Sequence, residues 1–116
     1  MEHRQLNHAN EFHQLFLTAI KNKVLITLSV WNNEVELDNN NDLIRGKYIV
    51  SGSHGGAIST VKVVEIFKEM AIKQALTTGE VAEMIIIVDK LFYKIKGELA
   101  QQVYKTIIDL EIDQNN

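Results

Sequence analysis

A long run of helical apolar spacing constrains the fold of this chain more than any other feature of its sequence. From Val81 to Leu110, apolar residues recur every three or four positions, which places them along one face of an α-helix. The chain contains no proline, and Gly97 costs only about 1 kcal/mol relative to alanine inside a helix. We therefore expect one uninterrupted helix of about 30 residues and about 45 Å over this stretch.

The residues before this stretch predict a shorter helix that pairs with it. Apolar residues recur with helical spacing from Ala57 to Ala75, which indicates a helix from about residue 58 to 76. Thr77 and Glu80 then have the spacing of a capping box, the hydrogen-bonding motif that opens many helices. We therefore expect a helical hairpin. Because its long arm is apolar on more than one side, that arm is expected to be central in the domain or to lie at a dimer interface.

The first third of the chain changes from a helical to an alternating apolar pattern. The spacing from Phe12 to Ile20 predicts a helix over residues 10–22, capped by Asn10. Val24, Ile26, Leu28 and Val30 then alternate with other residues up to Trp31. This period of two is typical of a β-strand with one buried face.

An antiparallel meander is expected after the first helix. A two-residue turn at Asn32–Asn33 would pair this strand with residues 34–38 and keep the apolar residues of both on one face. A loop at 39–42 would return residues 43–50 as a third strand. The expected fold is a single α+β domain over residues 1–116, in the order α-β-β-β-α-α. It has an N-terminal helix, a three-stranded antiparallel meander and a C-terminal helical hairpin with one long helix.

Composition excludes several classes of function. The net charge is −3 with acidic and basic residues interspersed, so binding to a phosphate backbone is not expected as the main activity. Without cysteine, the chain has no disulfide, thiolate zinc site or cysteine nucleophile. Its N-terminal residues lack the pattern of a signal peptide, and its longest apolar run is too short to span a bilayer. We expect a cytoplasmic protein with no membrane contact.

The segment from Lys47 to Thr60 is the first candidate site. A strand, a glycine-rich turn and a helix in succession can direct free backbone N–H groups at an anion. The segment lacks the lysine and the glycine spacing of known phosphate-binding loops, so a sharp turn between two elements is the alternative interpretation. The candidate ligand-binding residues are Lys47, Ser51, Gly52, Ser53, His54, Gly55, Gly56, Ser59 and Thr60.

The histidines do not indicate catalysis or metal binding. His54 has no carboxylate near it in sequence to orient it as a general base. His3, His8 and His13 are spaced by five residues, which separates successive side chains by about 140° on a helix, so that they do not converge. We therefore assign no catalytic residue, no metal ligand and no cofactor, and a hydrolase that uses His54 stays the enzymatic alternative.

Aromatic residues supply the second candidate site, a surface for a protein partner or for another copy of the chain. In the expected hairpin register, Trp31 lies on the face opposite the main apolar residues. It forms either a binding patch with Tyr48 or one of the scattered apolar residues that are normal on a surface. The candidate interface residues are Trp31, Tyr48, Phe92, Tyr93 and Tyr104.

Two functions from different classes are compatible with these features. The first is a non-enzymatic binding protein, homo-oligomeric, that sequesters or inhibits a partner protein as immunity proteins, antitoxins and phage-encoded inhibitors do. The second is a small-molecule binder that holds a phosphorylated ligand, such as a nucleotide or cyclic nucleotide, at the glycine loop of residues 51–57.

Overall fold

The computed structural model describes residues 2–32, 36–37, 39–40, 43–45, 48–51 and 60–110. Its helices and one short 3-10 turn are α1 (Ala9–Asn22), α2 (Thr60–Lys73), η1 (Thr78–Glu80) and α3 (Gly97–Asp109). Its strands are β1 (Glu2–Arg4), β2 (Ile26–Asn32), β3 (Glu36–Leu37), β4 (Leu43–Arg45), β5 (Tyr48–Ser51), β6 (Val81–Val88) and β7 (Leu91–Lys96).

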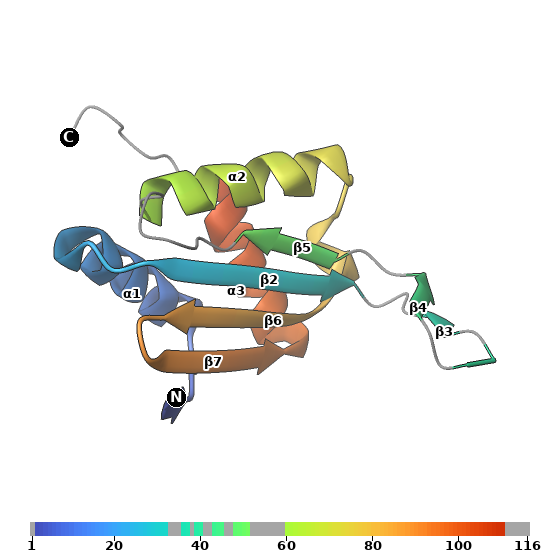
Figure 1. Cartoon of the computed structure of the whole chain (residues 1–116), viewed down its shortest axis with the longest axis horizontal. Helices are drawn as coiled ribbons and strands as arrows, with labels where there is room; N and C mark the ends of the chain where they lie inside the picture. The colour runs from blue at the N-terminus through green and yellow to red at the C-terminus, as the bar shows by residue number, and fades with distance from the viewer. Residues whose placement is uncertain are drawn as a thin grey trace.

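Five strands form the main sheet, in the order β1-β7-β6-β2-β5. β7, β6, β2 and β5 pair antiparallel, whereas β1 joins the edge in parallel with β7. β3 and β4 pair with each other in a separate two-stranded sheet. The central strands β2 and β6 therefore come from distant parts of the sequence and lie side by side (Figure 1).

One face of the main sheet is covered by helices and carries the core. Figure 1 shows α1 and α3 behind the strands, and α2 runs along the side of β5. The strand residues that face the helices are fully or almost fully buried, and they are Ile26, Leu28, Val30, Met84, Ile86, Val88, Tyr93 and Ile95. They pack against buried apolar residues of the three helices, such as Phe12, Phe67 and Val103. The molecule is an α+β domain in two layers.

The single helix expected from Val81 to Leu110 is wrong, because the first half of this stretch forms a β-hairpin. β6 and β7 pair antiparallel through a tight turn at Asp89 and Lys90, and Asp89 has a positive φ of 54°. β6 is a central strand with apolar residues on both faces, so its apolar residues are consecutive rather than alternating. A consecutive apolar run matches a helical stripe as well as a strand, and the long-range pairing with β2 decides for the strand.

Gly97 marks the boundary that the expected helix lacked. It has a φ of +61°, a left-handed conformation that costs glycine little and other residues more. α3 begins at this residue, after an extended Lys96. The glycine therefore turns the chain from β7 into the helix, and the order α-β-β-β-α-α is wrong along with the helical hairpin.

The three-stranded meander is also wrong. β2 does not pair with β3, the described part of the expected second strand, because the two edges of β2 are taken by β5 and by β6 and β3 pairs with β4. The pairing with β6 extends from Ile26 opposite Val88 to Asn32 opposite Val81, far longer than a local hairpin with residues 34–38 would allow. The third expected strand divides into β4 and β5, which belong to different sheets.

Local sequence signals predicted the ends of the helices more accurately than they predicted the pairing of the strands. α1 ends at Asn22 as expected, with Lys23 at a positive φ of 56°, but it begins at Ala9, and Asn10 lies inside it instead of capping it. α2 ends at Lys73, three residues before the expected end. The capping box is present, with the Thr77 N–H donating to Glu80 Oε1 at 3.0 Å. It opens the short turn η1 rather than a long helix.

Candidate functional site

The face of the sheet opposite the core is the main candidate site, and we call it the open face. None of the described helices lies on it, and it is turned toward the viewer in Figure 1. Its residues follow from the sheet register. The open face comprises His3, Thr27, Ser29, Trp31, Glu83, Ile85, Ile87, Phe92, Lys94 and Lys96.

Cross-strand rows arrange these residues with the apolar ones in the middle. Ile87 of β6 lies between Phe92 of β7 and Thr27 of β2. Two residues earlier in β6, Ile85 lies between Lys94 of β7 and Ser29 of β2. The apolar centre therefore lies on β6, with Phe92 of β7 beside it, and a partner surface placed there can exclude water.

The third row combines charge with an aromatic side chain. Glu83 of β6 lies between Lys96 of β7 and Trp31 of β2. Tyr48 of β5 is the register partner of Trp31 on the other side. Trp31, Ile85, Ile87 and Phe92 are all half-buried, because neighbouring side chains on the sheet cover part of each. At one edge of the face the ring of His3 lies 4.8 Å from that of Phe92.

A charged pair crosses the open face between β6 and β7. Lys94 Nζ lies 3.3 Å from Glu83 Oε1, and 26% of the Glu83 side chain is exposed. This distance is that of an ion pair, yet Oε1 itself is buried and receives no hydrogen bond of normal geometry in the described part of the chain. Glu83 is therefore held on the face by attraction to Lys94, with capacity left to accept a further hydrogen bond.

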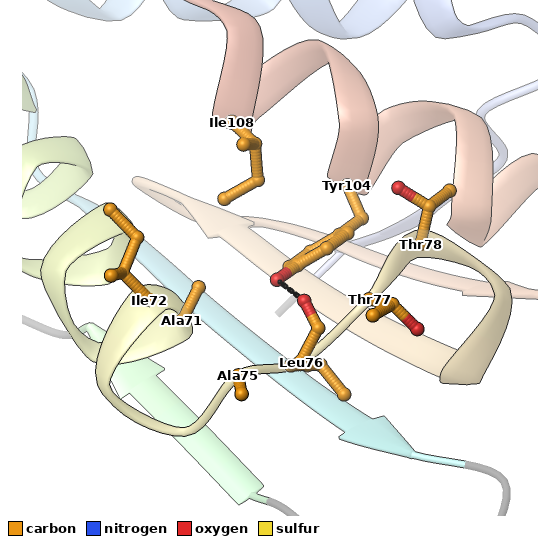
Figure 2. Close-up of a pocket in the computed structure, with 8 residues that line it drawn as sticks. All are labelled: Ala71, Ile72, Ala75, Leu76, Thr77, Thr78, Tyr104 and Ile108. Atoms are coloured by element: carbon orange, nitrogen blue, oxygen red, sulfur yellow. Dashed lines mark hydrogen bonds between the residues drawn. The ribbon is translucent and has the colours of Figure 1, made fainter.

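A shallow apolar hollow of about 430 Å³ lies on the helical side, between the end of α2 and α3. Figure 2 shows Ala71, Ile72 and Ala75 on one side of it and Tyr104 and Ile108 on the other. Ile72 is 73% exposed at its rim. The hydroxyl of Tyr104 donates to the Leu76 carbonyl at 2.7 Å, so this polar group is already satisfied by the fold.

Burial raises the pKa of the Tyr104 hydroxyl above its usual 10.0, and the negative charge of Glu80 raises it further. Both effects disfavour the phenolate. Tyr104 is therefore a neutral structural group near pH 7, with its ring 6.0 Å from that of Phe67 in an edge-on arrangement.

A second hollow, of about 330 Å³, lies beside the turn between β6 and β7. Leu15, Thr18 and Asn22 of α1 line one side, and Asp89 and Lys90 line the other. Within the described part of the chain, none of these residues has a buried polar side-chain atom without a hydrogen-bond partner. The hollow therefore offers no chemistry beyond that of an ordinary surface depression.

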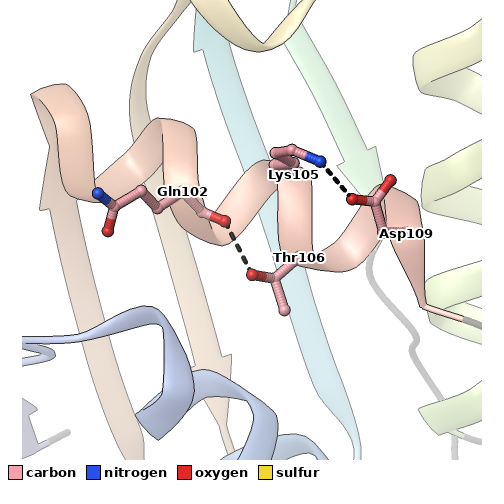
Figure 3. A network of polar contacts seen from close by, with 4 residues as sticks. All are labelled: Gln102, Lys105, Thr106 and Asp109. Atoms are coloured by element: carbon pink, nitrogen blue, oxygen red, sulfur yellow. Dashed lines mark hydrogen bonds and ion pairs between the residues drawn. The ribbon is translucent and has the colours of Figure 1, made fainter.

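The outer side of α3 carries a polar network that belongs to the helix surface (Figure 3). Lys105 Nζ donates to Asp109 Oδ2 at 2.6 Å, one helical turn away, and both side chains are mostly exposed. The hydroxyl of Thr106 donates to the Gln102 carbonyl at 2.9 Å. Exposed pairs of this kind contribute at most about 0.5 kcal/mol, so the network stabilises the helix slightly and forms no site.

The candidate anion site lies largely outside the described residues. Lys47 and residues 52–59 are outside them, and Ser51 is described only as the last residue of β5. Thr60 is buried at the start of α2, and its hydroxyl donates to the Val24 carbonyl at 2.6 Å. That hydroxyl fastens α2 to the segment before β2.

The five candidate interface residues lie on both sides of the sheet. Trp31 and Phe92 are on the open face, and Tyr48 is the register partner of Trp31. Tyr93 and Tyr104 are 9% and 2% exposed and belong to the core. The prediction that Trp31 lies opposite the main apolar residues is confirmed, because Ile26, Leu28 and Val30 of the same strand are buried against the helices.

Sequence reasoning missed most of the open face. The helical spacing places several of its residues in a helix, namely Ile85, Ile87, Lys94 and Lys96. The signal that indicates a common strand face instead is their alternation with Met84, Ile86, Tyr93 and Ile95. In the described ranges, no group of three or more His, Asp or Glu side chains is arranged to hold a metal ion.

No helix among the described residues is both long and apolar enough to cross a membrane. No family model matches the chain, and comparison with curated proteins and with solved structures found no match.

Proposed function

We propose that this chain is a non-enzymatic binding protein that sequesters or inhibits a partner protein, which it contacts through the open face. The observation that carries the proposal is a sheet face with no described helix over it and with large apolar side chains, Ile85 and Ile87 of β6, at its centre. The solvated face of an antiparallel sheet is usually polar, so adjacent large apolar side chains at the centre of such a face indicate a binding surface.

The residue types on the open face fit a protein partner. Trp31 and Phe92 are large aromatic side chains that lose little conformational freedom on binding, and tryptophan is enriched among residues that dominate binding energy. The face is a broad, twisted surface of strand residues, which suits the extended surface of a protein better than a small molecule, which needs a concave site.

Charge on the open face favours a partner with acidic groups at its margin. Lys94 and Lys96 of β7 are exposed, whereas Glu83 is the acidic residue of the face. Cations at a rim increase the association rate and select against like-charged surfaces. The partner surface is therefore expected to be apolar at its centre with Asp or Glu on the side that meets β7.

The test compares proteins retained from an extract of the source cells by immobilised wild-type protein and by two variants. Ile85→Lys places a charge in the centre of the open face. Leu17→Lys is the matched control, because Leu17 is 46% exposed on α1, on the helical side of the sheet. A true partner is retained by the wild type and by Leu17→Lys and lost by Ile85→Lys, and both variants must keep the wild-type circular dichroism spectrum.

The partner so identified is then purified and its affinity measured by calorimetry against Trp31→Ala. Loss of a central aromatic contact costs about 2 kcal/mol or more, which is about a thirtyfold increase in Kd. The proposal is refuted if no protein passes the variant comparison, or if the purified partner binds Trp31→Ala and Ile85→Lys as tightly as the wild type.

Binding of a phosphorylated ligand by residues 51–57 stays a prediction. Apart from the backbone of Ser51, those residues lie outside the described part of the chain. Calorimetry with a panel of nucleotides and cyclic nucleotides, on the wild type and on Gly55→Val, tests it independently of the open face.

A further inference from the structure

We propose that the outer edge of β7 binds an extended acidic segment of the partner protein, which displaces β1 and adds a strand to the main sheet. The inference rests on the proposed function, because this edge borders the open face and the partner is the same. It names the element of the partner that meets β7. Its test uses a synthetic peptide, so it can fail while the capture of a partner through the open face succeeds.

β1 covers only the first half of the outer edge of β7. It pairs in parallel with residues 91–93, and no other described strand lies on this edge (Figure 1). The N–H of Glu2 donates to the Lys90 carbonyl at 2.9 Å, so the backbone groups of every second residue after Lys90 also point to this edge. Those of Lys94 and Lys96 are therefore directed at a place where the described chain provides no neighbouring strand.

The contacts that hold β1 on this edge are few and exposed. All three of its residues are exposed, and its charged side chains, Glu2 and Arg4, pair with each other at 3.1 Å. Short, exposed strands at the end of a chain open at low cost in free energy. Leu6 is only 4% exposed and packs in the core. β1 can therefore leave the edge while Leu6 keeps the start of α1 in place.

A segment gains more hydrogen bonds by replacing β1 than by adding to its outer side. Because Glu2 and Arg4 direct their backbone groups at β7, His3 is the residue of β1 that directs its own outward. The six-residue β7 offers the backbone groups of Phe92, Lys94 and Lys96 instead. Backbone hydrogen bonds supply much of the affinity when a strand is added to a sheet.

The charges along β7 select an acidic segment. Lys94 and Lys96 are exposed on the open face, and β7 contains no acidic residue. Lysines on an edge strand repel another copy of the same edge, which disfavours a second copy of this chain as the occupant. Acidic residues beside the two lysines would be favourable cross-strand neighbours. Lys94 already lies 3.3 Å from Glu83, so Lys96 is expected to contribute most of the attraction.

The spacing of side chains in the segment follows from the two faces of the sheet. Positions beside Phe92, Lys94 and Lys96 share the open face and are two residues apart. Glu2 and Arg4 occupy the helical side of this edge, yet more than half of each side chain is exposed, so the described helices do not cover a strand placed there. The segment is therefore expected to alternate two acidic residues and one apolar residue with polar ones.

The test measures binding of a short fluorescent peptide that alternates threonine with glutamate, glutamate and phenylalanine, in that order. This order suits antiparallel pairing with β7, which is slightly more stable than parallel pairing. Fluorescence anisotropy is expected to give a Kd below about 1 mM for the wild type. A peptide with lysine in place of both glutamates is expected not to bind.

Two variants and a matched control test the edge and the displacement. Lys96→Glu is expected to raise the Kd by about tenfold, whereas Lys105→Glu, which changes an exposed lysine on α3 by the same charge, is expected to leave it unchanged. Glu2→Pro removes the hydrogen bond to the Lys90 carbonyl, so β1 competes less and the Kd is expected to fall by about threefold or more. Thermal unfolding of each variant confirms that it is folded.

Amide hydrogen exchange in the wild type gives a second measurement that needs no variant. Bound peptide is expected to slow exchange at Lys96, which gains a strand partner, and to speed exchange at Arg4, which leaves the edge. The reverse pattern, or protection confined to other strands, would overturn the inference.

The inference is also overturned if the glutamate peptide does not bind at concentrations up to about 1 mM, or if Lys96→Glu binds it as tightly as Lys105→Glu. A Glu2→Pro variant that is folded and binds no more tightly than the wild type shows that the segment does not replace β1. None of these results alters the comparison of partner capture by Ile85→Lys and Leu17→Lys, so failure of the edge and failure of the open face are distinguishable.

Discussion

Neighbouring isoleucines of β6 give a direct test of the architecture. Ile86 is fully buried against the helices, whereas Ile85 is half-buried on the open face. A helix from Val81 to Leu110 would reverse this order, because its apolar stripe includes position 85 and leaves position 86 outside. Replacing each residue by alanine therefore distinguishes the two-layer fold from the fold that apolar spacing alone suggests.

The expected losses follow from the burial of each side chain. Ile86→Ala removes a fully buried branched side chain from a core that includes Phe67 and Val103, and such changes cost about 2–5 kcal/mol in the free energy of unfolding. Ile85→Ala removes a side chain that is still partly in contact with water. With the transfer free energy reduced and no sealed cavity left behind, we expect a loss of about 1 kcal/mol.

Equilibrium unfolding in urea measures both losses. Each variant is unfolded at several protein concentrations, because self-association would add stability that depends on concentration. Values from the lowest concentration report the single chain. An unchanged dependence of the free energy on urea shows that the two variants unfold the same amount of surface.

Equal losses for the two variants, or a larger loss for Ile85→Ala at the lowest concentration, would refute the assignment of the two faces. Ile87→Ala serves as a second measurement on the open face, and Met84→Ala as a second one in the core. Ile87→Ala is expected to lose about as much stability as Ile85→Ala, and Met84→Ala about as much as Ile86→Ala.

Two further predictions concern single structural positions. Gly97→Ala is expected to lower the free energy of unfolding by about 1 kcal/mol in a urea titration, because a φ of +61° strains any residue with a Cβ; an unchanged midpoint would contradict the glycine's role in the turn from β7 to α3. Since the pKa of Tyr104 is raised in the folded chain, folding retains the phenolic proton, and the stability it contributes is complete below pH 10.0 and declines as the pH rises above that value. Tyr104→Phe is expected to lose stability at pH 7 through the missing bond to the Leu76 carbonyl and to show a smaller further decline above pH 10.0 than the wild type in thermal unfolding; parallel pH profiles would refute this assignment.

Much of the local structure was predictable from the sequence because its causes are local. The helical spacing from Phe12 to Ile20 gave α1 within one residue at its start. The alternation from Ile26 to Trp31 gave β2 and placed Trp31 on the face away from the core. The spacing of Thr77 and Glu80 identified a capping box that the structure contains. Each of these signals depends on residues within one or two turns of each other.

The arrangement of the sheet depended on contacts that no local pattern records. Ile85, Ile86 and Ile87 are consecutive because β6 is covered by helices on one face and carries the open face on the other. Such a run fits a helix and a central strand equally well. Only its pairing with β2, more than 50 residues earlier in the chain, decides between them.

The sequence by itself therefore determined the class of the domain, its first helix and first long strand, and the orientation of Trp31. The tertiary structure alone decided that Val81–Lys96 is a hairpin, that β2 is central, and that Glu83, Ile85, Ile87 and Lys96 share one face with Trp31. The physical reason is that a strand acquires its hydrogen bonds from another part of the chain, whereas a helix acquires them from itself. The candidate site lies on strands, and it was therefore the part of this protein that its sequence specified least directly.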